Sequence, residues 1–101
     1  MSKKLNFIQT KEAYIKTLAQ YVPIVARVHG ESHPEFHEVH KVYDELAKKI
    51  KAAGAEKPES LKEGFIQLRE ITNNYTVPDD VCESYEAVYN MLSELDKAYE
   101  V

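Results

Sequence analysis

Apolar residues recur at steps of three and four along four stretches of the chain, which is the spacing of one face of an α-helix. The first stretch runs from about Leu5 or Thr10 to Val28, and the second from Pro34 to Ala53. The third runs from Pro58 to about Asn73, and the fourth from Pro78 to about Tyr99. No stretch shows sustained alternation with period two, so the pattern predicts an all-α protein.

Glycine and proline separate these stretches in the order that is typical of helix ends and helix starts. Gly30 and Gly54 follow apolar-periodic residues, whereas Pro34, Pro58 and Pro78 stand where a new stretch begins. The joining loops are short, and short loops force successive helices to pack antiparallel. We therefore predict that residues 1–101 form a single domain, an up-down-up-down antiparallel four-helix bundle.

The apolar stripe of each stretch predicts the core. The four stripes are Phe7, Tyr14, Leu18, Tyr21, Val25 and Val28; then Phe36, Val39, Tyr43, Leu46, Ile50 and Ala53; then Leu61, Phe65, Leu68 and Ile71 or Thr72; and finally Val81, Tyr85, Val88, Leu92, Leu95 and Tyr99. Pro23 lies inside the first stripe. Because proline removes a backbone donor and clashes with the preceding turn, we expect a kink or a break near Gln20–Val22.

Composition narrows the class of protein. The chain has 101 residues, of which 44% are apolar and 30% charged, as in an ordinary globular domain. Its net charge of −4 disfavours binding to nucleic acid, which is itself negatively charged. Its single cysteine excludes an internal disulfide. No apolar run approaches the roughly 20 residues of a membrane helix, and the first residues lack the apolar region of a signal peptide. We expect a soluble, cytoplasmic protein that binds neither membranes nor nucleic acid.

Histidine is the unusual local feature, because all four histidines fall in one short stretch: His29, His33, His37 and His40. The last three are spaced i, i+4 and i+7, which would place them on one side of a helix, although His33 stands at or before the predicted cap. Such imidazoles can share a transition metal, and Glu38 or Asp44 could complete the site. Alternatively, these histidines are solvated surface residues, since they lie beside the apolar stripe and not on it.

The remaining chemistry is sparse. Cys82 falls beside the fourth stripe, near the predicted start of the fourth helix, and we interpret it as a packed, inert thiol. The stripes themselves contain no carboxylate of the kind that ligates iron in helix bundles. The chain has no glycine-rich phosphate loop, no nucleophile elbow and no basic–aromatic pattern for nucleic acid. No enzymatic activity is predicted.

Two segments are similar to a known family. Residues 25–36 read VARVHGESHPEF, and residues 68–82 read LREITNNYTVPDDVC. The first segment resembles the junction of the first two helices in the hemerythrin-like domain of the di-iron proteins that repair iron–sulfur clusters. The second resembles the stretch that joins the third and fourth helices of that domain. The resemblance extends from about Phe7 to Tyr99 and implies a shortened hemerythrin-like four-helix bundle.

The resemblance also implies a comparison of metal ligands. The family holds two irons with five histidines and two glutamates, and of these His29, in its Val-His-Gly context, is the one that can be placed. Near the other aligned positions only Glu56 and Glu59 offer a similar side chain. Four further ligand positions align near Ile8, Ala53, Lys57 and Pro58, and the last two lie beyond residue 101. A di-iron site needs inward ligands from several helices, so the resemblance implies the fold without the iron centre.

The sequence supports hypotheses of different classes. The favoured one is a degenerate hemerythrin-like module without a di-iron centre or cofactor, which acts by protein interaction or regulation. Its link to iron–sulfur cluster repair or to nitrosative and oxidative stress comes only from the resemblance. The second is a mononuclear metal protein that uses His29, His33, His37 and His40. The third is an enzyme or redox protein of the parent type, and the fourth is a haem or small-ligand binder near His29.

A homodimer is expected if shortened helices leave apolar residues partly uncovered. The residues concerned are Phe7, Ile8, Leu95 and Tyr99.

Overall fold

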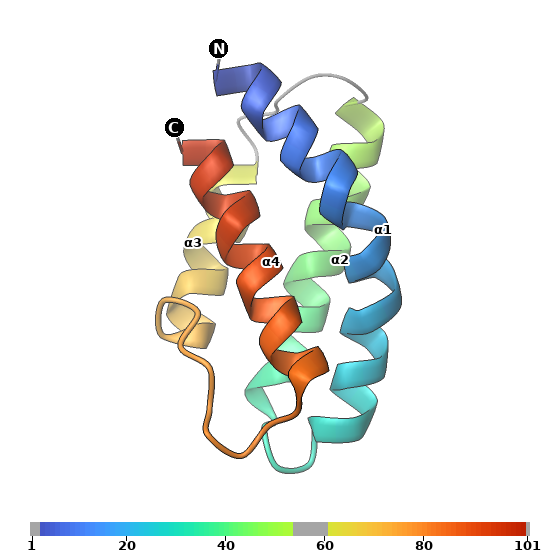
Figure 1. Ribbon diagram of the computed structural model, residues 1–101, viewed down its shortest axis with the longest axis vertical. Helices are drawn as coiled ribbons and strands as arrows, with labels where there is room; N and C mark the ends of the chain where they lie inside the picture. The colour runs from blue at the N-terminus through green and yellow to red at the C-terminus, as the bar shows by residue number, and fades with distance from the viewer. Residues whose placement is uncertain (1–2, 54–60, 101) are drawn as a thin grey trace.

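The helices lie close to the predicted stretches. A computed structural model describes residues 3–53 and 61–100, and within these residues the chain forms four helices and no strand (Figure 1). The helices are α1 (Lys3–His29), α2 (Glu35–Ala53), α3 (Leu61–Thr72) and α4 (Glu83–Glu100). The predicted all-α four-helix bundle is therefore confirmed, with a radius of gyration of 13.0 Å that matches a compact chain of this length.

The fourth helix starts later than predicted. It begins at Glu83 and not near Pro78, so residues 78–82 form an irregular approach to α4. The residues predicted to separate the second and third helices, Gly54 and Pro58, lie outside the described residues.

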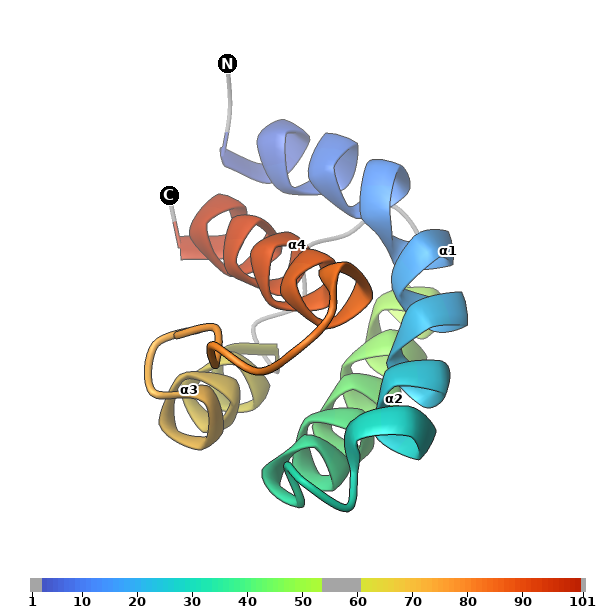
Figure 2. The same ribbon diagram turned by 60° about the horizontal axis from the view of Figure 1, so that its bottom comes forward.

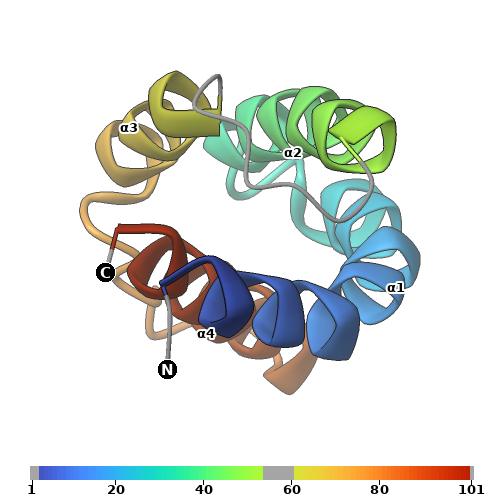
Figure 3. The ribbon, with the colours of Figure 1, turned by 90° about the horizontal axis from the view of Figure 1, so that it is seen from above.

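Pro23 does not break the first helix, because α1 continues through it without interruption. The axis of α1 nevertheless changes direction along its length (Figures 1 and 2). Its N-terminal half lies against α4, whereas its C-terminal half runs beside α2, which in turn packs on α3 (Figure 3). A single curved helix therefore covers two neighbours.

Aromatic rings fill the interior in two groups. Phe7 and Phe65 both contact Tyr99, and their ring centroids lie 5.4 and 5.2 Å, respectively, from the centroid of the Tyr99 ring. Phe36 contacts Tyr85 at 4.9 Å, and Tyr85 contacts Tyr89 at 4.8 Å. All six rings are buried: Phe7, Phe36, Phe65, Tyr85, Tyr89 and Tyr99. Such ring pairs each add about 0.5–1.5 kcal/mol to the stabilisation from burial alone.

The residues of α1 that face the core differ in part from the predicted first stripe. Val28 belongs to the predicted core but is 62% exposed, whereas Val22 and Ala26 are buried. Steps of four, three and four residues lead from Leu18 through Val22 and Val25 to residue 29, so a histidine takes the last position on the inward face.

The apolar surface that was expected to favour a homodimer is covered within one chain. Phe7, Leu95 and Tyr99 are buried, because the N-terminal half of α1 lies over α4. Ile8 is half-buried. Among the described residues, the large apolar side chains that remain exposed are Ile24, Val28 and Ile66. The homodimer itself stays a prediction, and the reason given for it is wrong for Phe7, Leu95 and Tyr99.

A polar network ties α3 to α4. The guanidinium of Arg69 on α3 donates to the carboxylate of Asp96 on α4, with 2.8 Å between Nε and Oδ2. The Tyr75 hydroxyl donates to the same Oδ2 at 2.7 Å. Burial and the neighbouring Asp96 raise the pKa of Tyr75 above its usual value, so the phenol stays protonated.

The backbone of the turn after α3 is unusual. Asn73, Asn74 and Tyr75 have φ angles of 53°, 60° and 61°, the left-handed region that residues other than glycine seldom adopt. The Thr72 hydroxyl accepts a hydrogen bond from the Tyr75 backbone N–H at 2.8 Å. The Tyr75 ring then reaches Asp96, so the polar network holds this turn in place.

None of the described helices is long and apolar enough to cross a lipid bilayer.

Candidate functional site

Ionisable side chains gather at the end of the bundle where α1 stops and where α2 and α4 start. His29 is the last residue of α1, and His33 lies in the turn that follows it. Glu35 is the first residue of α2, whereas Asp80 and Cys82 lie in the approach to α4. Residues about fifty positions apart in the sequence are thus brought together at this end.

His33 joins the two halves of the cluster. Its Nδ1 lies 2.9 Å from Oε1 of Glu35, and its Nε2 lies 2.9 Å from Oδ1 of Asp80. Partial burial lowers the pKa of His33, but the two carboxylates outweigh this effect and raise the pKa above 6.5. In its protonated form the imidazole donates to both carboxylates and ties the segment before α4 to the start of α2.

His29 lies beside the cysteine. Its Nε2 is 3.1 Å from the Sγ of Cys82, and its ring meets the Tyr85 ring edge-on at a centroid distance of 5.4 Å. Cys82 is exposed, so its interpretation as a packed thiol is wrong. The error follows from the later start of α4, because Cys82 precedes the helix and does not follow its core stripe. The contact gives a thiol–imidazole hydrogen bond between the end of α1 and the start of α4.

The other two histidines face elsewhere. His37 is exposed and lies directly against Gly30, where an added Cβ would fall 2.3 Å from His37 Nε2. His40 Nε2 lies 3.4 Å from Oδ2 of Asp44 one turn further along α2, and both side chains reach solvent. A surface pair of this kind contributes little to stability.

The four histidines therefore do not converge. The spacing of His33, His37 and His40 predicted one helix face, but His33 stands in the turn before α2 and points to Asp80. Within residues 3–53 and 61–100, no three histidine, cysteine, aspartate or glutamate side chains are arranged to hold a metal ion. Metal binding by His29, His33, His37 and His40 stays a prediction, without an assembled site among these residues.

The described residues also fail to fit a di-iron centre. Ile8 and Ala53, at two of the positions where the resemblance implies ligands, are half-buried aliphatic residues, and Lys57 and Pro58 lie outside the described residues. Contrary to the prediction, one carboxylate is buried: Asp96 is 3% exposed. Its oxygens are already taken by Arg69 and Tyr75, and it lies away from His29 in the network between α3 and α4. One histidine and one committed carboxylate cannot bridge two metal ions.

Sequence reasoning missed Asp96, although a signal was present. Leu92, Asp96 and Tyr99 are spaced by four and three residues, so the acid sits on the same helix face as core residues. A charged residue at such a position predicts a buried cationic partner, since an unpaired buried charge is costly.

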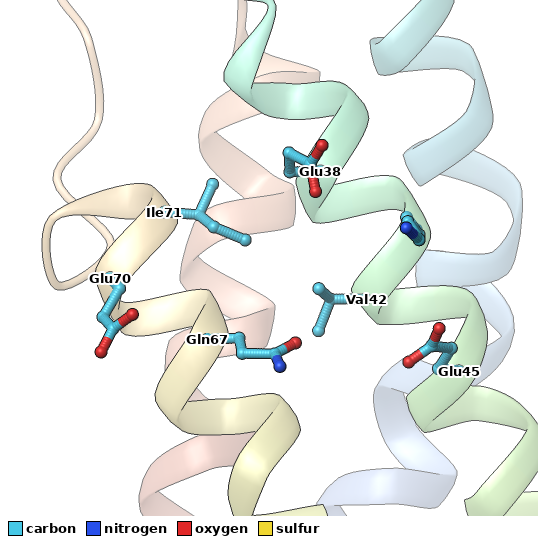
Figure 4. A pocket seen from close by; sticks show the side chains of 7 residues that line it. Glu38, Val42, Glu45, Gln67, Glu70 and Ile71 are labelled. Atoms are coloured by element: carbon cyan, nitrogen blue, oxygen red, sulfur yellow. The ribbon is translucent and has the colours of Figure 1, made fainter.

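A shallow acidic groove lies between α2 and α3. It has a volume of about 350 Å³ and is lined by Glu38, Lys41, Val42, Glu45, Gln67, Glu70 and Ile71. Figure 4 shows Gln67 and Ile71 reaching from α3 towards α2, with Val42 opposite them. Its carboxylates come from both helices.

Comparison of the chain with protein-family models, with curated proteins and with solved structures found no match.

Proposed function

We propose that the chain is a degenerate hemerythrin-like module, an up-down-up-down bundle that works by binding another protein and not by iron chemistry. The filling of the interior carries this proposal. A metal-binding bundle needs inward histidines and carboxylates from several helices. In this bundle the rings of Phe36, Tyr85 and Tyr89 contact one another in the interior, and the ring of Phe65 contacts that of Tyr99.

The polar atoms inside the bundle support the same proposal. The Tyr85 and Tyr89 hydroxyls lie 3.0 Å apart and bond to each other. Burial is the main cause that raises the pKa of both phenols, so neither is a ready anionic ligand near neutral pH. Within the described residues, no buried side-chain nitrogen or oxygen lacks a hydrogen-bond partner. An interior of this kind stabilises the fold. We therefore infer that the function of the protein lies on its surface.

The proposal is tested with untagged protein that is loaded anaerobically with ferrous iron and then exposed to air. We expect less than about 0.1 iron per chain after desalting, no oxo-bridged ferric absorption bands and no rise in Tm, because a ligand that binds the native state would stabilise it. Two irons per chain with those bands would overturn the proposal and restore the parent chemistry. Zinc and nickel in parallel samples test the four-histidine hypothesis, with His33→Gln as the variant that should lose any such binding.

The link to iron–sulfur cluster repair or to oxidative and nitrosative stress belongs to the same proposal and rests on the resemblance of residues 25–36 and 68–82. It is tested in cells by deleting the gene and measuring the recovery of an iron–sulfur enzyme after nitric oxide exposure. Recovery at the parental rate would separate the chain from that process.

A further inference from the structure

A second groove, between α1 and α2, is larger and mostly apolar. Its volume is about 530 Å³, and its lining residues are Lys11, Ile15, Lys16, Ala19, Tyr43, Ala47, Ile50 and Lys51. The N-terminal half of α1 turns away from α2 towards α4 (Figures 1 and 3). The Tyr43 hydroxyl donates to the Ile15 carbonyl at 3.0 Å, so a hydrogen bond joins the two helices there.

The charge of the residues that line this groove is one-sided. Of the eight described residues that line it, three are lysines and none is acidic, although the whole chain carries a net charge of −4. Lys16 and Lys51 are exposed, and they come from different helices. The acidic groove on the opposite side of α2 has three glutamates and one lysine, so the two grooves attract partners of opposite charge.

The dimensions suit a helix. The lining residues run from Lys11 to Ala19 on α1 and from Tyr43 to Lys51 on α2, so the first and last are eight residue steps apart on each helix. At 1.5 Å per residue, both walls are about 12 Å long, or a little over two helical turns. Apolar side chains at i, i+3 or i+4, and i+7 of a partner helix span about 10 Å, which fits within this length.

We propose that the groove between α1 and α2 binds an acidic amphipathic helix of a partner protein. The apolar face of that helix rests on Ile15, Ala47 and Ile50, and its flanking aspartate or glutamate residues face Lys16 and Lys51. This inference deepens the proposed function, on which it rests, by naming the surface and the chemistry of the partner.

The test is a selection that leaves the charge of the partner open. A display library of 16-residue peptides keeps leucine at positions i, i+3, i+4 and i+7 and varies the outward positions among Asp, Glu, Lys, Arg, Gln and Ser. The immobilised full chain selects binders, and the best peptide is then titrated into ¹⁵N-labelled protein. We expect enriched peptides to be acidic, and the shifted amides to lie in residues 11–19 and 43–51.

Matched variants locate the binding. Reversing both exposed lysines in Lys16→Glu/Lys51→Glu is expected to weaken the best peptide about tenfold, because two favourable charge pairs become unfavourable. Lys48→Glu is the control, since Lys48 is exposed on α2 and does not line the groove; its effect should stay below about twofold. Raising the salt concentration should weaken binding to the native chain more than to the double variant.

Several outcomes would overturn the inference. Enrichment of basic or neutral peptides would contradict the charge argument, and shifts that map to the acidic groove would contradict the location. No enrichment, with decanoate alone shifting the groove amides, would make the site one for small amphiphiles; no enrichment and no shift would remove the site. A dimer that dissociates in the double variant would make the occupant a second copy. None of these results bears on iron binding, so the metal-loading experiment tests the proposed function separately.

Discussion

Replacing Arg69 by methionine tests how much the polar network between α3 and α4 stabilises the fold. Methionine keeps most of the length of the side chain and removes the guanidinium, so packing changes little while Asp96 loses its cationic partner. Asp96 is only 3% exposed and retains a single described donor, the Tyr75 hydroxyl at 2.7 Å.

The magnitude follows from burial. Removing one partner of a buried ion pair typically costs about 3–5 kcal/mol. The Arg69 side chain is one-third exposed, so water can reach the site after the substitution, and we expect a somewhat smaller loss, about 2–4 kcal/mol. For a domain of this size, such a loss lowers Tm by roughly 10–25 °C.

The assay is urea unfolding, followed by circular dichroism, of the native chain, Arg69→Met, Asp96→Leu and the double variant. Because the double variant buries no unpaired charge, it should be more stable than Arg69→Met, which gives a coupling energy in the cycle. Lys97→Met, an exposed neighbour on α4, is the control and should change stability by less than about 0.5 kcal/mol. A loss below about 1 kcal/mol for Arg69→Met, or a double variant weaker than both single ones, would refute the reasoning.

Three further predictions concern single positions. Gly64→Ala should lower stability by about 1 kcal/mol even though alanine favours helix by a similar amount, because the new Cβ would lie 2.5 Å from Cδ2 of buried Leu46; an unfolding midpoint at or above that of the native chain would contradict this. The raised pKa of His33 means that its carboxylate pairs stabilise the fold fully below pH 6.5 and that this stabilisation is lost as the pH rises through the folded-state pKa. His33→Gln should therefore cost more at pH 6 than at pH 8 in urea unfolding, and an equal cost at both pH values would contradict this. Tyr43→Phe should lose about 1 kcal/mol, because it removes the hydroxyl that donates to the α1 carbonyl and joins α2 to α1; calorimetry showing an unchanged Tm would argue against it.

Gly64 illustrates how a local and a tertiary effect can oppose each other. In sequence, a glycine in the third stretch only weakens a helix. In the fold it lets α3 approach Leu46 of α2 more closely than any side chain would allow. Local propensity could not reveal this use, because it depends on which helix lies opposite.

The chemistry at the end of the bundle could be predicted only in part. The clustering of histidines around residue 33 was visible, since all four fall in one short stretch. Their partners were not, because Asp80 and Cys82 lie about fifty residues further along the chain. His33 precedes the first turn of α2, as its place at or before the predicted cap indicated, so it does not share a face of that helix with His37 and His40.

The sequence by itself determined the helices and most of the core. Periodic apolar positions act locally, since a helix repeats every 3.6 residues whatever its neighbours, so Phe36, Leu68 and Leu92 could be assigned to the interior. Only the tertiary structure decided which way the curved α1 faces, and with it the burial of Val22 and Ala26 and the exposure of Val28. Pairings between helices depend on the relative position and rotation of the helices. Many weak contacts between distant residues set that arrangement together, so no single stretch of sequence encodes it.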